Sequence, residues 1–314
     1  MQSTARDRTV VLGTGGTIAG TAADPADNVG YDAAQIGVAQ LVEAVPALAG
    51  LAIESEQVAQ LDSKDMDFAT WQRLVHRVAH HLARAEVSGI VITHGTDTLE
   101  ETAYFLQRVL APGKPVVLTA AMRPATALLA DGPQNLLDAV RVARSAGARG
   151  VVAVLAGKVF SAFDVRKVHT YRLDAFGAGE AGPIGFVEEG RLRMLRPWPE
   201  GAALGLARID VEAAAWPRVE IIVNHVGAGP AVVNALLTHG VDAIVVAGTG
   251  NGSMAQALEA ALREAERAGV RVVRCSRCAD GPVIGGPDEG FAAAGASTAV
   301  QARVELLLEV LRSR

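Results

Sequence analysis

The chain is poor in the residues on which several protein classes depend. Its 314 residues include only two cysteines and 4% aromatic residues. No apolar run approaches the roughly 20 residues that span a bilayer, so we do not expect a membrane protein. The formal net charge is −5 and no basic run is present, which argues against nucleic acid as a partner. The polar N-terminus predicts no export signal and a cytoplasmic protein.

The two cysteines, Cys275 and Cys278, have a C-x-x-C spacing, but two ligands are too few for a zinc site. Four ligands are required, and the sequence has no second pair. A redox pair belongs at a helix start, where the dipole lowers the thiol pKa. Here a strand-like run precedes the pair and Asp280-Gly281-Pro282 follows it, so we predict a structural role.

The histidines do not form a metal motif either. His76 and His80 have a helical spacing, but Arg77 stands where a zinc protease carries glutamate. With His81 beside them, they predict a solvated helix face. We therefore expect neither a metal nor a cofactor.

The remaining composition is that of an ordinary globular protein, of a length that suits one large domain or two medium ones. Short apolar runs alternate with stretches of helical periodicity. Val/Ile runs between helices are typical of strands buried on both faces, which predicts an α/β fold with a mainly parallel sheet flanked by helices. The predicted strands are Val10–Leu12, Ile90–Thr93, Val116–Thr119, Val151–Leu155, Ile221–Asn224, Ala243–Ala247 and Val272–Arg274, and the predicted helices are Phe68–Ala85, Glu100–Leu110, Asn135–Ala146, Ala231–Thr238 and Met254–Ala268.

A proline-containing segment interrupts this alternation. Pro197, Pro199 and Pro217 flank the small-residue run GAALGLA, which is typical of a linker. We predict a larger N-terminal α/β catalytic domain at residues 1–195, a linker at 196–216 and a smaller C-terminal α/β domain at 217–314.

Glycine-rich and hydroxyl-bearing loops follow four of the predicted strands. Ligands of open parallel sheets bind beyond the carboxyl ends of the strands, so these loops form the candidate active-site rim. The first loop lacks the third glycine of a dinucleotide fingerprint and the lysine of a P-loop, which argues against a nucleotide site. The loops are Gly13–Gly20, Thr93–Glu101, Ala120–Arg123 and Gly248–Ser253.

Threonine is the candidate nucleophile on this rim. Thr17 lies among glycines, whose exposed N–H groups suit an oxyanion hole. No G-x-S-x-G or S-x-x-K motif is present, which argues against the common serine hydrolases. Lys167, taken alone, is an ordinary loop lysine that solvent would surround.

The second loop brings three polar side chains close together in sequence: Thr93, His94 and Thr96. Asp97 or Thr98 is expected to cap the helix that follows. Capping does not explain why the other three residues are grouped, so this loop also belongs to the candidate site.

Motifs along nearly the whole chain form one pattern. They are Gly15-Gly16-Thr17-Ile18-Ala19, Thr93-His94-Gly95-Thr96-Asp97-Thr98, Glu100-Glu101-Thr102-Ala103, Ala121-Met122-Arg123-Pro124, Asp131-Gly132-Pro133, Asp164-Val165, Lys167 and Gly250-Asn251-Gly252. In this order they resemble the bacterial-type L-asparaginase/glutaminase family. The likeness is nearest to its high-affinity, periplasmic-type branch.

The resemblance implies hydrolysis of L-asparagine to L-aspartate and ammonia without metal or cofactor. It implies that Thr17 is the nucleophile of an acyl-enzyme mechanism, with Tyr31 beside it on a mobile lid. Thr96, Asp97 and Lys167 would form a second cluster that manages protons and holds the substrate. The family's assembly is a homo-oligomer, a tetramer built as a dimer of dimers.

The resemblance also implies how the substrate binds. Ser63 would bind the α-carboxylate and Asp97 the α-ammonium, and the Ala121 carbonyl would lie near the side-chain amide. The substrate-binding set comprises Gly16, Ser63, Lys64, Gly95, Thr96, Asp97, Ala121 and Asn251.

Two positions depart from the family pattern. Lys64 stands where the family commonly has Gln or Glu, and its cation would oppose the substrate ammonium unless it points away. Relatives also carry an acid, supplied by a neighbouring subunit, a few residues before the glycine that matches Gly290. This chain has no acid at that spacing, and Asp288 and Glu289 are the candidates to replace it.

Two alternatives to an asparaginase stay open at this point. A balanced glutaminase-asparaginase differs only in accepting one more methylene, which pockets discriminate by about 1–3 kcal/mol. A catalytically silent amino-acid-binding protein is the other alternative. The presence of Thr17, Thr96, Asp97 and Lys167 together argues against it, because binding alone does not need all four.

Overall fold

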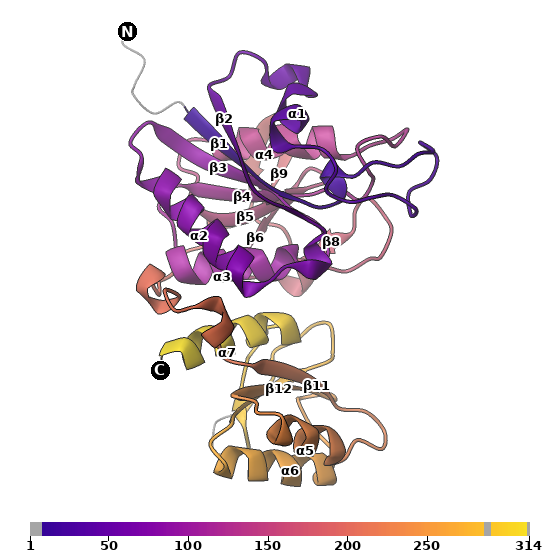
Figure 1. Cartoon of the computed structure of the whole chain (residues 1–314), viewed down its shortest axis with the longest axis vertical. Helices are drawn as coiled ribbons and strands as arrows, with labels where there is room; N and C mark the ends of the chain where they lie inside the picture. Colours follow the sequence, from indigo (N-terminus) through magenta and orange to yellow (C-terminus); the bar gives the residue numbers. More distant parts are fainter. Residues whose placement is uncertain (1–7, 286–289, 313–314) are drawn as a thin grey trace. The chain divides into compact units, whose positions relative to one another are not determined.

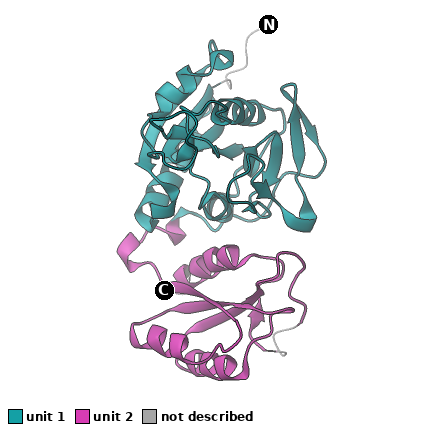
Figure 2. Cartoon of the chain, turned by 90° about the vertical axis from the view of Figure 1, so that its right-hand side faces the viewer, with its two compact units in different colours: residues 1–206 teal, residues 207–314 magenta. Residues whose placement is uncertain are grey.

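The computed structural model describes residues 8–285 and 290–312. The chain divides into two compact units, Met1–Leu206 and Ala207–Arg314 (Figure 2). This division lies inside the segment predicted as a linker, and the predicted domain ends at 195 and 217 stay predictions. Within the described ranges, no helix has the length and apolar character needed to cross a bilayer.

The first unit is built on an eight-stranded sheet in the order β10-β9-β6-β5-β4-β3-β1-β2 (Figure 1). Strands β1 to β5 pair in parallel, and the remaining pairs are antiparallel. The predicted mainly parallel sheet is therefore confirmed. The strands are β1 (Arg8–Gly15), β2 (Ile53–Leu61), β3 (Val87–Thr93), β4 (Pro115–Thr119), β5 (Gly150–Leu155), β6 (Lys158–Ser161), β9 (Gly185–Glu188) and β10 (Arg191–Met194).

Helices cover both faces of this sheet, which explains why its central strands are almost wholly apolar. Figure 1 shows α1 (Val38–Glu43) and α4 (Gly132–Ala143) on one side and α2 (Phe68–Ala83) and α3 (Leu99–Leu110) on the other. On the α4 side, valines of β1, β3, β4 and β5 join residues of α4 in one buried cluster. A separate two-stranded ribbon consists of β7 (Arg166–Lys167) and β8 (Phe176–Gly177).

The second unit has a smaller sheet in the order β11-β12-β13-β14, paired in parallel throughout. Its strands are β11 (Val219–Val223), β12 (Ala243–Gly248), β13 (Arg271–Ser276) and β14 (Ala292–Ala293). Residues of α5 (Ala231–Thr238) and α6 (Gln256–Arg267) form one buried cluster with the sheet. Helix α7 (Ala299–Arg312) packs against β11, β12 and β13 on the opposite face (Figure 1).

Every predicted strand and helix corresponds to an element of the structure, with ends that differ by a few residues. The elements that the sequence did not predict include both edge strands of the large sheet, β2 and β10, and several short 3-10 helices. Strand β2, for example, is only half buried, so its apolar pattern is weak. The unpredicted elements include α1, α7, β2, β6, β9, β10 and the short helices η1 (Thr17–Ala19), η2 (Pro46–Leu48), η3 (Ser63–Asp65), η4 (Gly179–Ala181), η5 (Leu206–Arg208) and η6 (Ala213–Ala215).

His81 corrects the prediction of a solvated histidine face on α2. Its side chain is buried, because one helical step turns it away from the exposed His80 toward β2. Arg84 donates a hydrogen bond to Nδ1 at 2.9 Å, so Nε2 carries the ring proton and donates to Glu56 at 2.8 Å. His81 therefore joins α2 to β2 rather than facing solvent.

The two cysteines differ in their surroundings. Cys275 is buried in β13, and burial raises the pKa of its thiol to about 11. Cys278 is exposed in the turn that follows, and neither cysteine forms a disulfide.

Candidate active site

Four loops of the first unit meet at the carboxyl ends of neighbouring parallel strands. The strands are β2, β1, β3 and β4, which lie side by side in the sheet (Figure 1). Because parallel strands end at the same edge, their loops form one rim. Most of the predicted site residues lie on these loops.

Glycines allow the loops to approach one another backbone to backbone. Gly16 has a φ of 81°, and a Cβ atom there would lie 2.3 Å from the Cα atom of Gly95. A Cβ atom on Gly95 would lie 2.4 Å from the hydroxyl oxygen of Ser63. The loops after β1, β3 and β2 are thus packed at distances that no larger residue permits. The predicted residues Gly16, Gly95 and Ser63 are brought together at this point.

Thr17 begins the short helix η1 directly after these glycines. Its side chain is 7% exposed, and its Oγ1 lies 2.7 Å from the hydroxyl oxygen of Tyr31. As the first residue of η1, Thr17 has a backbone N–H without an acceptor inside that helix. A buried hydroxyl beside a phenol, with a backbone N–H that its own helix leaves unbonded, is suited to nucleophilic attack on a carbonyl.

Tyr31 belongs to a loop, residues 21–32, that we call the lid. Its two ends are joined by paired backbone hydrogen bonds of 2.9 Å between Thr21 and Asp32. The lid also bonds to the loop after β4, since the Thr126 hydroxyl accepts from the Ala22 N–H at 2.8 Å. The position of Tyr31 therefore depends on a few contacts at the surface.

Lys167, on β7, joins the second cluster of hydroxyl and carboxylate groups. Its Nζ donates to Thr96 Oγ1 at 2.9 Å and to Asp97 Oδ1 at 2.6 Å. The Thr96 hydroxyl is buried, whereas the Asp97 side chain is half exposed. The structure thus brings together the three residues that the resemblance grouped.

Ser63 is buried and bonded to the loop that follows β3. Its Oγ accepts from the Asp97 N–H at 3.2 Å, and its carbonyl accepts from the Thr98 hydroxyl at 2.8 Å. Thr98 occupies the N-cap position of α3, but its side chain makes no capping hydrogen bond. The prediction that Asp97 or Thr98 caps α3 is therefore confirmed for the position of Thr98. It is wrong for the side chain, because the Thr98 hydroxyl donates to the Ser63 carbonyl instead.

Lys64 does not present an unpaired cation. Its Nζ donates to the Asp62 carboxylate at 2.8 Å, and its side chain is 64% exposed. This pairing raises the pKa of the Lys64 ammonium, which keeps it charged. The departure from the family pattern at this position is compensated by Asp62.

The loop after β4 contains the fully buried Ala121. The Asp131 carboxylate accepts a hydrogen bond from the Arg123 N–H at 2.9 Å, and Asn135 donates to the Ala120 carbonyl at 2.9 Å. The sequence analysis did not predict that Asn135 bonds to the loop after β4. Its place four residues after an aspartate, on the same face of α4, was the only available signal.

His94 supports the loop after β3 from inside the core. Trp71 donates to Thr102, which donates to Nε2 of His94, and Nδ1 of His94 donates to the Gly95 carbonyl, at 2.9, 3.0 and 2.8 Å. Burial lowers the pKa of His94 to about 4, so the ring is neutral at pH 7. Because both ring nitrogens are occupied, His94 holds the loop rather than exchanging protons.

Asn251, predicted to bind substrate, lies in the second unit. Its side-chain amide donates to the Ile284 carbonyl and accepts from the Ile284 N–H, both at 2.7 Å. Asp288 and Glu289, the candidates for the replaced acid, lie outside the described residues.

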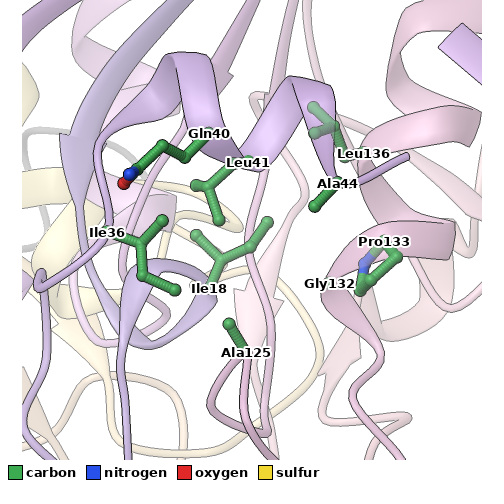
Figure 3. Close-up of a pocket in the computed structure, with 9 residues that line it drawn as sticks. All are labelled: Ile18, Ile36, Gln40, Leu41, Ala44, Ala125, Gly132, Pro133 and Leu136. Carbon is green, nitrogen blue, oxygen red and sulfur yellow. The ribbon is translucent and has the colours of Figure 1, made fainter. Parts of the chain in front are cut away.

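A pocket of about 390 Å³ is lined in part by Ile18, the residue after Thr17 (Figure 3). Gln40 is the one polar side chain among the nine residues that line it. Such a lining does not suit the charged groups of a free amino acid. The pocket is therefore adjacent to the candidate site through Ile18, and its apolar lining does not match the chemistry of the rim. The other labelled residues are Ile36, Leu41, Ala44, Ala125, Gly132, Pro133 and Leu136.

The described residues contain no cluster of three or more His, Cys, Asp or Glu side chains that could hold a metal ion. The groups gathered on the rim are instead hydroxyls, a carboxylate and an ammonium. These groups suit nucleophilic attack and proton transfer at a carbonyl.

Comparison with known proteins identifies relatives of both units. The protein-family model "Asparaginase, N-terminal" matches residues 8–200, and the model "Glutaminase/Asparaginase C-terminal domain" matches residues 218–312. L-asparaginase 2 of Escherichia coli (strain K12) is 36% identical over 97% of this chain and 89% of its own length. L-asparaginase 2 of Bacillus subtilis (strain 168) is 38% identical over 90% and 75%.

Two further proteins bear on substrate and fold. The glutaminase-asparaginase of Pseudomonas fluorescens biotype A is 41% identical over 85% of this chain and 74% of its own length. The crystal structure of a probable cytoplasmic L-asparaginase from Campylobacter jejuni superposes with a TM-score of 0.90 at 35% identity. It covers 98% of this chain and 100% of its own.

Proposed function

Because this chain belongs to the asparaginase family of amidohydrolases, we propose that it hydrolyses L-asparagine to L-aspartate and ammonia with Thr17 as the nucleophile. The observation that carries this proposal is the 2.7 Å contact between Thr17 Oγ1 and the Tyr31 hydroxyl. The packing of Gly16 on Gly95 brings this pair next to the loop that bears Thr96.

The reaction proceeds in two steps. The Thr17 oxygen attacks the side-chain amide carbon and the hydroxyl proton passes to the leaving nitrogen; the carbon–nitrogen bond then breaks, so that ammonia departs and an aspartyl ester of Thr17 remains. Water then attacks this ester, which releases aspartate and restores the hydroxyl. N–H groups of the glycine-rich loop stabilise the oxyanion in both steps.

The second cluster supplies proton transfer and substrate binding. Lys167 and Thr96 form a hydrogen-bonded pair that can pass a proton during ester formation and hydrolysis. Asp97 is bonded to Lys167 but half exposed, so its free carboxylate oxygen suits the substrate ammonium. Ser63 lies beside Gly95, where its hydroxyl suits the α-carboxylate.

Glutamine hydrolysis is the second candidate activity. The relative from Pseudomonas fluorescens is named for both substrates at an identity similar to that of the asparaginases. The assay is ammonia release from asparagine and from glutamine, side by side, with wild-type protein and Thr17→Ala. We expect release from asparagine that Thr17→Ala abolishes; release that survives this substitution would reject the nucleophile.

The active assembly is proposed to be a homotetramer built as a dimer of dimers, located in the cytoplasm. The family resemblance motivates the assembly, and the Campylobacter jejuni relative is described as probable cytoplasmic. Asn251 and an acid from residues 288–289 would then serve a neighbouring subunit's site. Sedimentation at several concentrations, with activity measured in parallel, tests this; a fully active monomer would overturn it.

A further inference from the structure

Glu100 is an acidic side chain that the mechanism above does not use. It lies in the first turn of α3, and its Oε2 accepts a hydrogen bond from the backbone N–H of Lys167 at 2.6 Å. The two residues are 67 positions apart in sequence. A partly buried carboxylate therefore bonds to the main chain of the lysine that joins Thr96 and Asp97.

This contact closes a ring of interactions around the second cluster. Thr96 and Asp97 precede Glu100 by only a few residues, in the loop that leads into α3. The Lys167 side chain bonds back to both residues, while its backbone bonds to Glu100. The start of α3 and strand β7 are thus joined twice, once through the lysine side chain and once through its backbone.

The contact with Glu100 fixes the position of the Lys167 backbone, which the contacts of the Lys167 side chain do not fix. A lysine side chain has four rotatable carbon–carbon bonds and can follow its partners over several conformations. The direction from which Nζ reaches Thr96 is set by where the Lys167 backbone lies. Strand β7 has two residues and pairs with β8, and the bond to Glu100 ties the Lys167 backbone to the start of α3 as well.

We propose that Glu100 is a positioning residue that holds Lys167 in line with Thr96 for proton transfer. The inference rests on the proposed role of Lys167 in the reaction. It assigns to the Glu100 carboxylate a function beyond its favourable interaction with the positive end of the α3 dipole.

The charge of Glu100 makes this role dependent on pH. Burial raises the pKa of Glu100 to about 7, and the neighbouring Glu101 also raises it, while the Lys167 N–H, Arg166 and the Lys167 ammonium lower it. A charged acceptor makes a hydrogen bond roughly twice as strong as a neutral one. The contact with Lys167 is therefore stronger above about pH 7 than below it.

The experiment compares pH profiles of kcat and KM for asparagine between pH 5 and 9. Glu100→Gln keeps an acceptor of the same shape but cannot ionise, and Glu100→Ala removes the acceptor. Glu43→Gln, on the exposed surface of α1, is the matched control for loss of one negative charge. Glu101→Gln removes a charge that raises the pKa of Glu100, so it should move the inflection to lower pH.

We expect kcat of Glu100→Gln to match the low-pH level of wild type and to lack the rise near neutral pH. Glu100→Ala should lose about 10-fold or more in kcat at pH 8 with little change in KM, since a misplaced proton-transfer group affects the chemical step. If both Glu100 variants have the pH profile of wild type while the separate variant Lys167→Met is inactive, the inference about Glu100 is wrong and the proposed function stands. A wild-type protein without amidase activity would overturn the proposed function as well.

Discussion

The two hydroxyl clusters of the site are held in different ways. Thr17 meets Tyr31, which is 14 residues away on a surface loop. Thr96, in the loop after β3, meets Lys167, which is 71 residues away on strand β7. The first cluster depends on a loop that a few hydrogen bonds hold down, whereas the second depends on the packing of the sheet and α3.

This difference indicates which part of the site can move. The lid has exposed residues such as Val29, which is 76% exposed, and regions with few buried contacts open at low free-energy cost. The second cluster lies against the buried His94 and Ser63, which fix its loop. We therefore expect the lid with Tyr31 to be the part of the site that opens at the lower free-energy cost.

The largest effect should come from removing the hydroxyl of the proposed nucleophile, Thr17, or that of Thr96, which is paired with Lys167. Thr17→Ala and Thr96→Ala should each reduce kcat on the order of 10³-fold, and the double variant should be little worse than either, because the residues act as a unit. Single-turnover ammonia release measures this. If the loss of kcat in the double variant equals the product of the two single losses, the two hydroxyls act independently in the reaction.

Gly16→Ala should disturb both clusters at once. Its Cβ atom would lie 2.3 Å from Gly95 Cα, at a φ of 81°. We expect a loss of roughly 2–4 kcal/mol in the free energy of unfolding, together with loss of activity. Gly50→Ala is the matched control, because its φ is 83° but no atom lies within 4 Å. If both variants are destabilised equally, the loss of stability comes from backbone strain and not from the contact between the loops.

Glu100→Gln should raise stability where it lowers activity. With its pKa raised to about 7, Glu100 retains a proton in the folded state that the unfolded chain releases from about pH 4.5 upward. Its contribution to stability is therefore complete below pH 4.5 and lost as the pH rises through 7. Relative to wild type, Glu100→Gln should gain on the order of 3 kcal/mol at pH 8 and nothing at pH 4. Urea unfolding at both pH values measures this, and an equal difference at the two would exclude ionisation as the cause.

Thr126→Val should affect the lid cluster alone. It removes the acceptor for the Ala22 N–H, a hydrogen bond worth about 0.5–1.5 kcal/mol. We expect kcat/KM to fall about 2- to 10-fold by the loss of lid closure, with the pH profile attributed to Glu100 unchanged. Thr126→Ser retains the hydroxyl and should behave as wild type; a loss of activity there would point to packing instead.

The smallest effect should come from Lys64→Gln. Because the Lys64 ammonium is already paired with Asp62 and exposed, KM should change by less than about 2-fold. Asp62→Asn, which frees the cation, should raise KM more. A larger response to Lys64→Gln than to Asp62→Asn would show that Lys64 faces the substrate despite the ion pair.

The contrast between buried and rim residues also explains how far the sequence was informative. Val/Ile runs predicted the central strands, because burial on both faces leaves no other composition possible. His81 escaped this reasoning, because its ring bonds to Arg84, three residues on, and to Glu56, 25 residues away on β2. Ser63 was located only through the family resemblance, since no local pattern marks it.

By itself, the sequence determined the α/β alternation and the loops that follow β1, β3 and β4; the fourth predicted rim loop follows β12 in the second unit, and the family resemblance supplied the proposed threonine nucleophile. The strands, helices and connecting loops follow from hydrophobic periodicity, which can be recognised in short stretches of the sequence. Only the tertiary structure decided which rim groups meet, as in the contact of Gly16 with Gly95 or of Glu100 with the Lys167 backbone. Such contacts join distant segments through the register of the sheet, which no local stretch of sequence specifies.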